Sequence, residues 1–345
     1  MSNKIMAATA GIAAIVLGAA GTAHAGKELD AIKARGQLIC GVGIGTAGFN
    51  LADSQGKWTG LNVDICRAVA AAIFGDADKV KYVPLTSQQR FTALQSGEVD
   101  LLSNNTTVTL TRDTALGFDF TGVTYYDGQG FMVPKKLGVK SAKELNGATV
   151  CVAPGTTTEL NLADYFRANK MTFKPVVIEK VDEIRGAFFS GRCDVYTTDA
   201  SGLYATRAAN VPAPLTIEDF IILPEIISKE PLGPVVRHGD SQFADIVRWA
   251  QFAMIEAEEY GITSKNVDEM MKSDNPVIKR ILGVTPGMGK ALGVDEKWVY
   301  NIVKQVGNYG EAFDRNVGMG SPLKIARGQN ELWTKGGLQY APPIR

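Results

Sequence analysis

The chain has 345 residues, of which 45% are hydrophobic and 21% are charged, and its 36 Lys and Arg residues balance 36 Asp and Glu residues. This length exceeds what one compact core usually supports, so a globular protein with two lobes is expected. The balanced charge gives no indication of binding to nucleic acid or to an anionic membrane surface.

Residues 1–25 differ in composition from the rest of the chain. Lys4 is the only charged residue before Lys27, and an Ala- and Gly-rich apolar run leads to the small-x-small site AHA. This pattern predicts a cleavable secretory signal peptide and a mature chain that starts at Gly26. The alternative is an uncleaved membrane anchor, but the run contains few strongly apolar residues.

After the predicted signal peptide, short apolar strands alternate with amphipathic helices. The strand-like segments QLICGVGI, KVKYVPL and VDLLSNN are separated by the helix-like segments DICRAVAAAIFG and SQQRFTALQSG, and the same order restarts after residue 140. This order predicts two α/β units, each with helices on both faces of an open sheet. Ligands of such sheets bind at the carboxyl ends of the strands, so a cleft between the lobes is the expected site.

Two extended, Gly- and Pro-containing stretches, 128–136 and 229–239, indicate crossings between the lobes. After the second crossing, a long amphipathic helix and a Gly-rich tail follow. The expected division is a first part of lobe 1 at 26–131, lobe 2 at 132–231, a return to lobe 1 at 232–282, and a C-terminal extension packing on lobe 1 at 283–345.

Four cysteines, Cys40, Cys66, Cys151 and Cys193, follow the predicted signal peptide. Export to an oxidising compartment makes an even number of cysteines a disulfide signal, and three pairings are possible. We favour Cys40–Cys66 and Cys151–Cys193, because each pair lies on neighbouring elements of one α/β unit. A zinc site is the alternative, but the sequence has no CxxC spacing and no His near these cysteines.

The segment GIGTAG, at residues 43–48, matches the GxGxxG pattern of dinucleotide-binding sites. Such a fingerprint must open a helix on whose N-terminus the pyrophosphate rests, whereas a polar turn sequence follows here. We interpret the segment as a turn that lines the cleft, and we expect neither a cofactor nor a metal.

Three polar segments follow predicted strand ends and form the candidate ligand site. The segment NNTTVTLTR carries Asn105, Thr107 and Arg112, and an arginine offers two parallel donors to a carboxylate; helix capping with a surface ion pair is the alternative. The segment PGTTTEL places Thr157 at a helix start that could hold an anion or form an ordinary capping box. Asp199 could hold an ammonium group or cap a helix.

Together with the signal peptide and the strand order, these segments resemble family 3 extracellular solute-binding proteins, the polar amino-acid receptors of ABC importers. TVTLTR is similar to the family's T-x-T-x-x-R, and GTTTE to its G-T-T-x-E. The likeness to the general L-amino-acid-binding subgroup extends over nearly all of the mature chain, including ISKEPLGP, VGNYGEAFDRN and LWTKGGLQYAPPIR.

The resemblance implies a type II periplasmic-binding-protein fold and a periplasmic monomer without enzymatic activity. It also implies that the ligand is a free L-amino acid and that the partners are ABC permease subunits in the inner membrane. Arg112 and Thr107 would bind the α-carboxylate from lobe 1, Thr157 would reach it from lobe 2, and Asp199 would bind the α-ammonium. Phe49 is expected beside the ligand's side chain, and capture is expected to close the lobes.

Ser87 and Arg90 lie in TSQQR, which resembles the T-S-Q-N-R stretch of glutamate/aspartate-binding members. There the arginine faces the side-chain carboxylate, whereas the alternatives are a solvated Arg90 or an ion pair with Glu98 or Asp100. Since Asn105 could serve amide side chains, we expect a broad range of ligands with a preference for Glu, Gln, Asp and Asn.

An enzyme on the same scaffold is the alternative function, because periplasmic cyclohexadienyl dehydratases resemble these receptors. Such an enzyme needs a carboxylic acid in the cleft to protonate a leaving hydroxyl, and Glu159 and Asp199 are the candidates. An intact clamp for a carboxylate and an ammonium group argues against this alternative.

Overall fold

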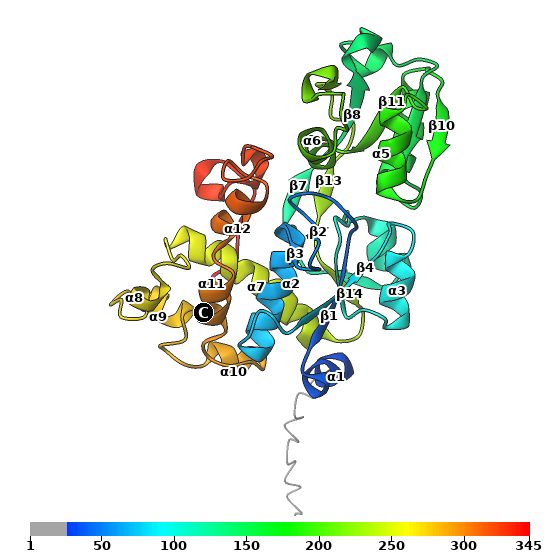
Figure 1. The fold of residues 1–345 in the computed structure, drawn as a ribbon. Helices are drawn as coiled ribbons and strands as arrows, with labels where there is room; N and C mark the ends of the chain where they lie inside the picture. Colours follow the sequence, from blue (N-terminus) through cyan, green and yellow to red (C-terminus); the bar gives the residue numbers. More distant parts are fainter. Residues whose placement is uncertain (1–25) are drawn as a thin grey trace, which may run out of the picture.

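The computed structural model describes residues 26–345, so the predicted signal peptide lies outside the described residues. Figure 1 shows two lobes, each built on its own five-stranded sheet. The sheet of lobe 1 has the order β4-β1-β5-β14-β6, formed by Val80–Pro84, Leu38–Val42, Leu101–Ser103, Val235–Arg237 and Phe118–Phe120. The sheet of lobe 2 has the order β10-β9-β11-β8-β12, formed by Lys174–Val177, Thr149–Val152, Val195–Asp199, Gln129–Pro134 and Phe220–Ile222.

Helices cover both faces of each sheet. Those of lobe 1 are α1 (Lys27–Arg35), α2 (Leu61–Phe74), α3 (Arg90–Ser96) and α7 (Ser241–Glu259). Those of lobe 2 are α4 (Thr157–Ala168), α5 (Val181–Phe189) and α6 (Ala200–Ala209). Successive side chains of a strand point to opposite faces of the sheet. On β5, Leu101 packs against apolar residues of α2 and α7 on one face, whereas Leu102 packs against apolar residues of α3 on the other.

The lobes are joined by two antiparallel strands, β7 (Tyr125–Asp127) and β13 (Glu230–Leu232), which pair with each other between the sheets (Figure 1). The second expected crossing therefore includes β13. The stretch expected as the first crossing differs, because Gln129–Pro134 forms β8 inside the sheet of lobe 2, and the expected boundary at residue 131 falls within this strand. Its glycine and proline suggested a linker, but five of its six residues are buried.

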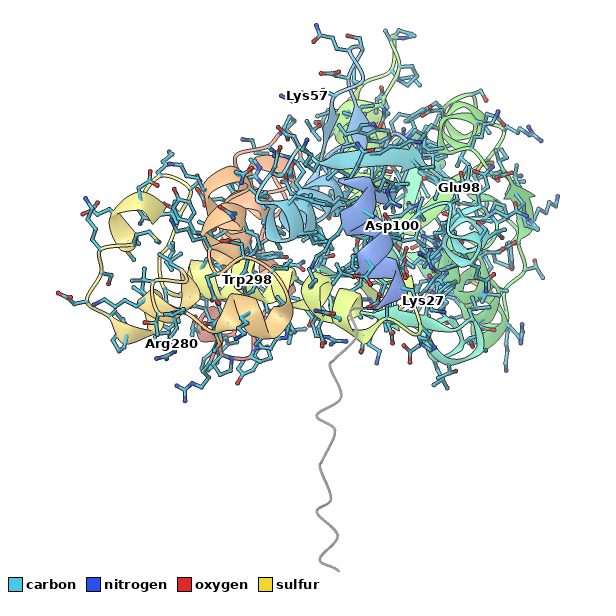
Figure 2. The ribbon with its side chains drawn as sticks, turned by 90° about the horizontal axis from the view of Figure 1, so that it is seen from below. Lys27, Lys57, Glu98, Asp100, Arg280 and Trp298 are labelled. Carbon is cyan, nitrogen blue, oxygen red and sulfur yellow. A yellow bond between two sulfur atoms is a disulfide. The ribbon has the colours of Figure 1, made fainter. Side chains whose placement is uncertain are left out.

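The chain after α7 forms five further helices against lobe 1. Two of them, α8 (Val267–Met270) and α9 (Pro276–Ile281), precede the expected C-terminal extension, and three, α10 (Met288–Leu292), α11 (Trp298–Gln305) and α12 (Tyr309–Asn316), lie within it. α11 packs on α2 and α7, and the buried Trp298, labelled in Figure 2, shares their apolar cluster. A short hairpin of β2 (Leu51–Ala52) and β3 (Trp58–Thr59) precedes α2. The predicted two-lobed α/β fold with a C-terminal extension is confirmed. Within residues 26–345, no helix is both long and apolar enough to cross a membrane.

Both predicted disulfides are present. Cys40 on β1 is bonded to Cys66 on α2, and Cys151 on β9 is bonded to Cys193, just before β11. The bonded cysteines are separated by 26 and 42 residues, and each bridge lies within one lobe, so neither bridge ties the lobes together.

Removing either disulfide is expected to destabilise the protein, because the unfolded chain then gains the conformational entropy that the disulfide-closed loop had removed. The Cys40→Ala/Cys66→Ala and Cys151→Ala/Cys193→Ala variants should each lose about 3 to 4 kcal/mol of unfolding free energy on the chain-entropy model. Urea denaturation under non-reducing conditions measures this loss, with the unmodified protein as reference. An unchanged unfolding free energy in both variants would contradict the expectation.

Candidate functional site

A cavity of about 420 Å³ lies between the lobes and is lined by both of them. Its wall includes six of the predicted ligand-binding residues: Ser87, Arg90, Asn105, Thr107, Thr157 and Asp199. The wall also contains Gly43, Ile44 and Thr46 from the GIGTAG segment, which turns from β1 into the β2–β3 hairpin and opens no helix.

Strand register brings these residues together. In lobe 1, Val42 at the end of β1 lies opposite Pro84 of β4 and Ser103 of β5, so the chain leaves all three strands at one edge. In lobe 2, β9 pairs in parallel with both β10 and β11. The carboxyl ends of both sets of strands carry the cavity wall, as expected for open α/β sheets.

Arg90 is a buried residue of the cavity wall, with 3% of its surface exposed. Its Nη1 donates to the carbonyl oxygen of Asn104 at 2.9 Å, whereas its buried Nε has no partner among the described residues. Burial and the nearby charge of Arg112 lower the pKa of Arg90 to about 9. The solvated alternative is wrong, and so is the pair with Asp100, which binds Arg35 and lies beside α1 in Figure 2.

Arg112 lies behind Thr107 and is absent from the cavity wall in the described part of the chain. It is 7% exposed, and its Nη1 donates to the Thr107 carbonyl at 2.9 Å, so the surface ion-pair alternative is wrong. The guanidinium carbons of Arg112 and Arg90 each lie 5.0 Å from the ring centre of Phe91. Two cations therefore share one aromatic ring at the lobe 1 side of the site.

Asp199 ends β11 and precedes α6, but its side chain makes no capping hydrogen bond to that helix. Burial raises its pKa well above the usual value, and the charges of Asp127 and Glu230 raise it further, while Arg90 and Arg112 lower it. A buried carboxylate surrounded by two other carboxylates is stabilised by a cationic ligand group.

Glu230 is the site residue that sequence reasoning missed. It lies on β13 between the lobes, is 1% exposed, and its Oε2 accepts from the hydroxyl groups of Thr107 at 2.6 Å and Thr157 at 2.7 Å. Its Oε1 accepts from Asn161 at 2.7 Å and Ser228 at 2.6 Å. The only available signal was its position in ISKEPLGP, and nothing in that segment indicates its partners.

These contacts change the expected role of the two threonines. A hydroxyl group has one proton to donate, and both protons are directed at Glu230. In this arrangement the hydroxyl oxygens of Thr107 and Thr157 can accept from a ligand but cannot donate to its carboxylate. The backbone N–H groups of Thr157 and Thr158, in the first turn of α4, are donors on the lobe 2 side that could still reach a carboxylate.

The lobes contact each other across the cavity in this structure. The hydroxyl oxygens of Thr107 and Thr157 are 3.3 Å apart, and Thr86 of lobe 1 donates to Glu179 of lobe 2 at 2.7 Å. A ligand in the cavity would therefore be touched from both sides.

Phe49 does not lie where it was expected. It is 1% exposed and packs in the core of lobe 1, with its ring centre 5.2 Å from that of Tyr125. Phe49 is not part of the cavity wall in the described chain, and it belongs to the same buried apolar cluster as the residues of α2. The expected contact with the ligand's side chain is therefore a misassignment.

A family model described as bacterial extracellular solute-binding proteins, family 3, matches residues 38–266. The chain is 57% identical over 350 residues to the General L-amino acid-binding periplasmic protein AapJ of Rhizobium johnstonii, with 100% of both chains covered. It is 54% identical over 346 residues to the Glutamate/glutamine/aspartate/asparagine-binding protein BztA of Rhodobacter capsulatus, again with 100% of both chains covered.

A solved structure gives a corresponding match in three dimensions. It is an ABC transporter/periplasmic binding protein from Brucella ovis with glutathione bound, to which this chain is 59% identical with a TM-score of 0.89. The superposition covers 92% of this chain and 99% of the other.

Proposed function

Because this chain belongs to the bacterial extracellular solute-binding proteins, family 3, we propose that it is the periplasmic component of an ABC importer and that it binds L-amino acids between its lobes. The observation that carries the proposal is the charge arrangement of the cavity. Asp199 of lobe 2 and Arg90 of lobe 1 both line the cavity, and the guanidinium group of Arg112 lies behind Thr107 on the lobe 1 side. This arrangement suits a zwitterion, whose two charges need fixed partners once water is excluded.

The ligand's α-carboxylate is assigned to the Arg112 side and to the free N–H groups at the start of α4. Its α-ammonium is assigned to Asp199, with the oxygens of Thr107 and Thr157 as further acceptors. This assignment follows from the hydrogen bonds in which the Thr107 and Thr157 hydroxyl groups donate to Glu230. The ligand would then contact both lobes, as Glu230 already does. Release then requires the lobes to separate, and β7 and β13 are the proposed hinge.

We assign the preferred ligands to the glutamate, glutamine, aspartate and asparagine class. Arg90 supports this preference, since its side chain lines the cavity and its buried Nε has no partner among residues 26–345. The printed name of the Rhodobacter capsulatus relative lists the same four amino acids. A peptide is a second candidate ligand, because the Brucella ovis relative has glutathione bound.

Catalysis on this scaffold is not favoured. The relatives named above are binding proteins, and of the two acids considered for a dehydratase only Asp199 lines the cavity of the described chain. Glu159 is instead engaged in helix capping, since its side chain accepts from the Gly155 N–H at 3.1 Å.

The test of the proposed function is a thermal-shift screen of the refolded mature protein against the twenty amino acids. Refolding removes ligand carried through purification. A ligand present at a hundred times its Kd adds about 2.7 kcal/mol to stability, so binders raise the Tm by several degrees. A protein whose Tm responds to none of the twenty amino acids would contradict the proposal.

Replacing Arg90 is expected to change the ligand preference. Arg90→Ala should weaken glutamate and aspartate at least about tenfold more than alanine and leucine, because only the acidic ligands lose a charge-assisted hydrogen bond. Competition of each amino acid against a bound fluorescent-labelled ligand gives the ratio of affinities within one variant, which is insensitive to a general loss of binding. If the ratio of affinities is the same in Arg90→Ala and in the unmodified protein, Arg90 does not contact the ligand's side chain.

A further inference from the structure

The C-terminal extension, whose end is red in Figure 1, contacts the crossing strand β7 through Asn330. Asn330 is 4% exposed; its Oδ1 accepts from the Tyr126 N–H at 2.6 Å, and its Nδ2 donates to the Tyr126 carbonyl at 3.1 Å. Tyr126 lies opposite Pro231 of β13, which has no N–H and whose carbonyl accepts from Val108 instead. The amide of Asn330 therefore satisfies the edge of β7 that faces away from β13, as a third strand would.

Two further buried residues of the extension, both on α12, contact the same crossing. The hydroxyl group of Tyr309 donates to the Thr124 carbonyl at 2.8 Å. The ring of Phe313 stacks on that of Tyr125, with the ring centres 6.0 Å apart and the planes 5° from parallel. The extension therefore holds the first crossing at three successive residues, of which Tyr126 is the last.

Arg327 fixes the position of Asn330 relative to lobe 1. Its two terminal nitrogens donate to the carboxylate of Glu258 on α7 at 3.0 and 3.2 Å, and its Nε donates to the Asn330 carbonyl at 2.9 Å. The guanidinium carbon also lies 5.1 Å from the ring centres of Tyr309 and Phe313. Paired charge-assisted hydrogen bonds constrain both partners, and α7 belongs to the core of lobe 1. The extension therefore connects β7 to the core of lobe 1.

The residues directly after Tyr126 bind lobe 2 instead. The carboxylate of Asp127 accepts from the Ser201 N–H at 3.3 Å, and the carbonyl of Gly128 accepts from the Ala200 N–H at 2.8 Å. The first crossing thus exchanges lobe 1 partners for lobe 2 partners between residues 126 and 127. A rotation of one lobe against the other is absorbed by the few residues at such a change of partners.

We propose that the C-terminal extension determines where the hinge bends, with Asn330 as the positioning residue that holds β7 against lobe 1. The proposal rests on the proposed function, since it assumes that a ligand closes the lobes about β7 and β13. Holding β7 reduces the number of open arrangements, so closure over a ligand costs less conformational entropy. Asn330 does not line the cavity of the described chain, so its loss should weaken all ligands by the same factor.

Asn330→Ala tests the proposal through the distance between the lobes in the refolded, ligand-free protein. Cysteines introduced at the exposed Lys81 of lobe 1 and Lys174 of lobe 2 can be spin-labelled selectively, because the four native cysteines are in disulfides. Pulsed electron paramagnetic resonance should give a broader distance distribution for Asn330→Ala than for the labelled protein with Asn330 intact. Calorimetric titration should give Kd values for glutamate, glutamine and alanine that are all raised about three- to tenfold.

Trp333→Phe is the matched control. It removes a 3.0 Å hydrogen bond from the same segment of the extension to Glu259 of α7, but that bond does not involve β7. The distance distribution and the three affinities should stay nearly unchanged in this variant. The inference is overturned if folded Asn330→Ala keeps the distance distribution of the protein with Asn330 intact, or if its losses of affinity differ among the three ligands by more than about threefold.

Hydrogen exchange of the unmodified protein decides the question even if Asn330→Ala does not fold. The Tyr126 amide, which donates to Asn330, should exchange at least about a hundredfold more slowly than in an unfolded peptide, without ligand as well as with glutamine. Rapid exchange of this amide in the ligand-free protein would overturn the inference, since β7 would then not be held while the lobes are open. If no amino acid binds, the proposed function is contradicted, whereas the ligand-free distance and exchange measurements still test the extension.

Discussion

Asp199→Asn is expected to weaken the binding of every amino acid by about thirtyfold or more, whatever the side chain. The substitution keeps the size of the residue and removes the charge that faces the ligand's ammonium group. Because that group would then be enclosed without the carboxylate assigned to pair with it, the loss does not depend on the rest of the ligand. Calorimetric titration with glutamate, glutamine and alanine measures it.

The same residue predicts a pH dependence of ligand affinity. Burial raises the pKa of Asp199, and Asp127 and Glu230 raise it further against the opposing effect of Arg90 and Arg112. Below that raised pKa the carboxyl group is neutral and cannot pair with an ammonium group. Affinity should therefore fall as the pH is lowered through this range in the unmodified protein and fall less steeply in the asparagine variant.

Glu159→Gln is the matched control for Asp199, since it neutralises another acid of lobe 2 that does not line the cavity of the described chain. It should leave affinity and its pH dependence nearly unchanged. Near-native affinity of Asp199→Asn for all three amino acids would contradict the assignment of the ligand's ammonium group to Asp199.

Arg112→Ala is the other substitution with a large expected effect. It removes a buried guanidinium from the lobe 1 side and leaves the ligand's carboxylate without that charge, so affinity for all amino acids should fall by about thirtyfold or more. Arg112→Lys should recover only part of the loss, because an ammonium group keeps the charge but does not reproduce the planar guanidinium that lies over Phe91 and donates to the Thr107 carbonyl. Titration of both variants with glutamate, glutamine and alanine separates the effect of the charge from that of the geometry.

Arg112 also holds the backbone at Thr107 through its 2.9 Å hydrogen bond, so the folding of each variant must be checked. Urea denaturation provides this readout. Arg167→Ala, which alters a 78% exposed arginine of lobe 2, serves as the control for a nonspecific charge change. If Arg112→Ala folds and binds all three amino acids as tightly as the unmodified protein, the carboxylate is held elsewhere.

The sequence predicted those features that depend on local pattern and strand order. Alternating strands and helices predicted the two α/β units, and the positions of Cys40 and Cys66 on adjacent elements predicted their disulfide. Thr157 and Asp199 follow strand ends, and parallel register is sufficient to bring such positions to one edge. These relations hold within one lobe and need no knowledge of how the lobes meet.

Features that depend on three-dimensional contact between distant segments escaped prediction. Glu230 accepts from Thr107 and Thr157 only because the lobes approach each other, and no spacing in the sequence encodes that approach. Phe49 follows a turn whose direction depends on the packing of α2 and Tyr125. Arg112 lies behind the wall and donates to the Thr107 carbonyl, a contact that its place in the motif does not indicate.

The central claim is that the cavity recognises both charges of one amino acid, and ligand analogues test it without any substitution in the protein. The measurement is calorimetric titration of the refolded, unmodified protein with glutamate, N-acetylglutamate and γ-aminobutyrate. The acetylated analogue lacks the ammonium charge, and γ-aminobutyrate lacks the α-carboxylate. We predict binding of glutamate and a loss of at least about thirtyfold for each analogue. Comparable affinity for all three compounds would contradict the claim.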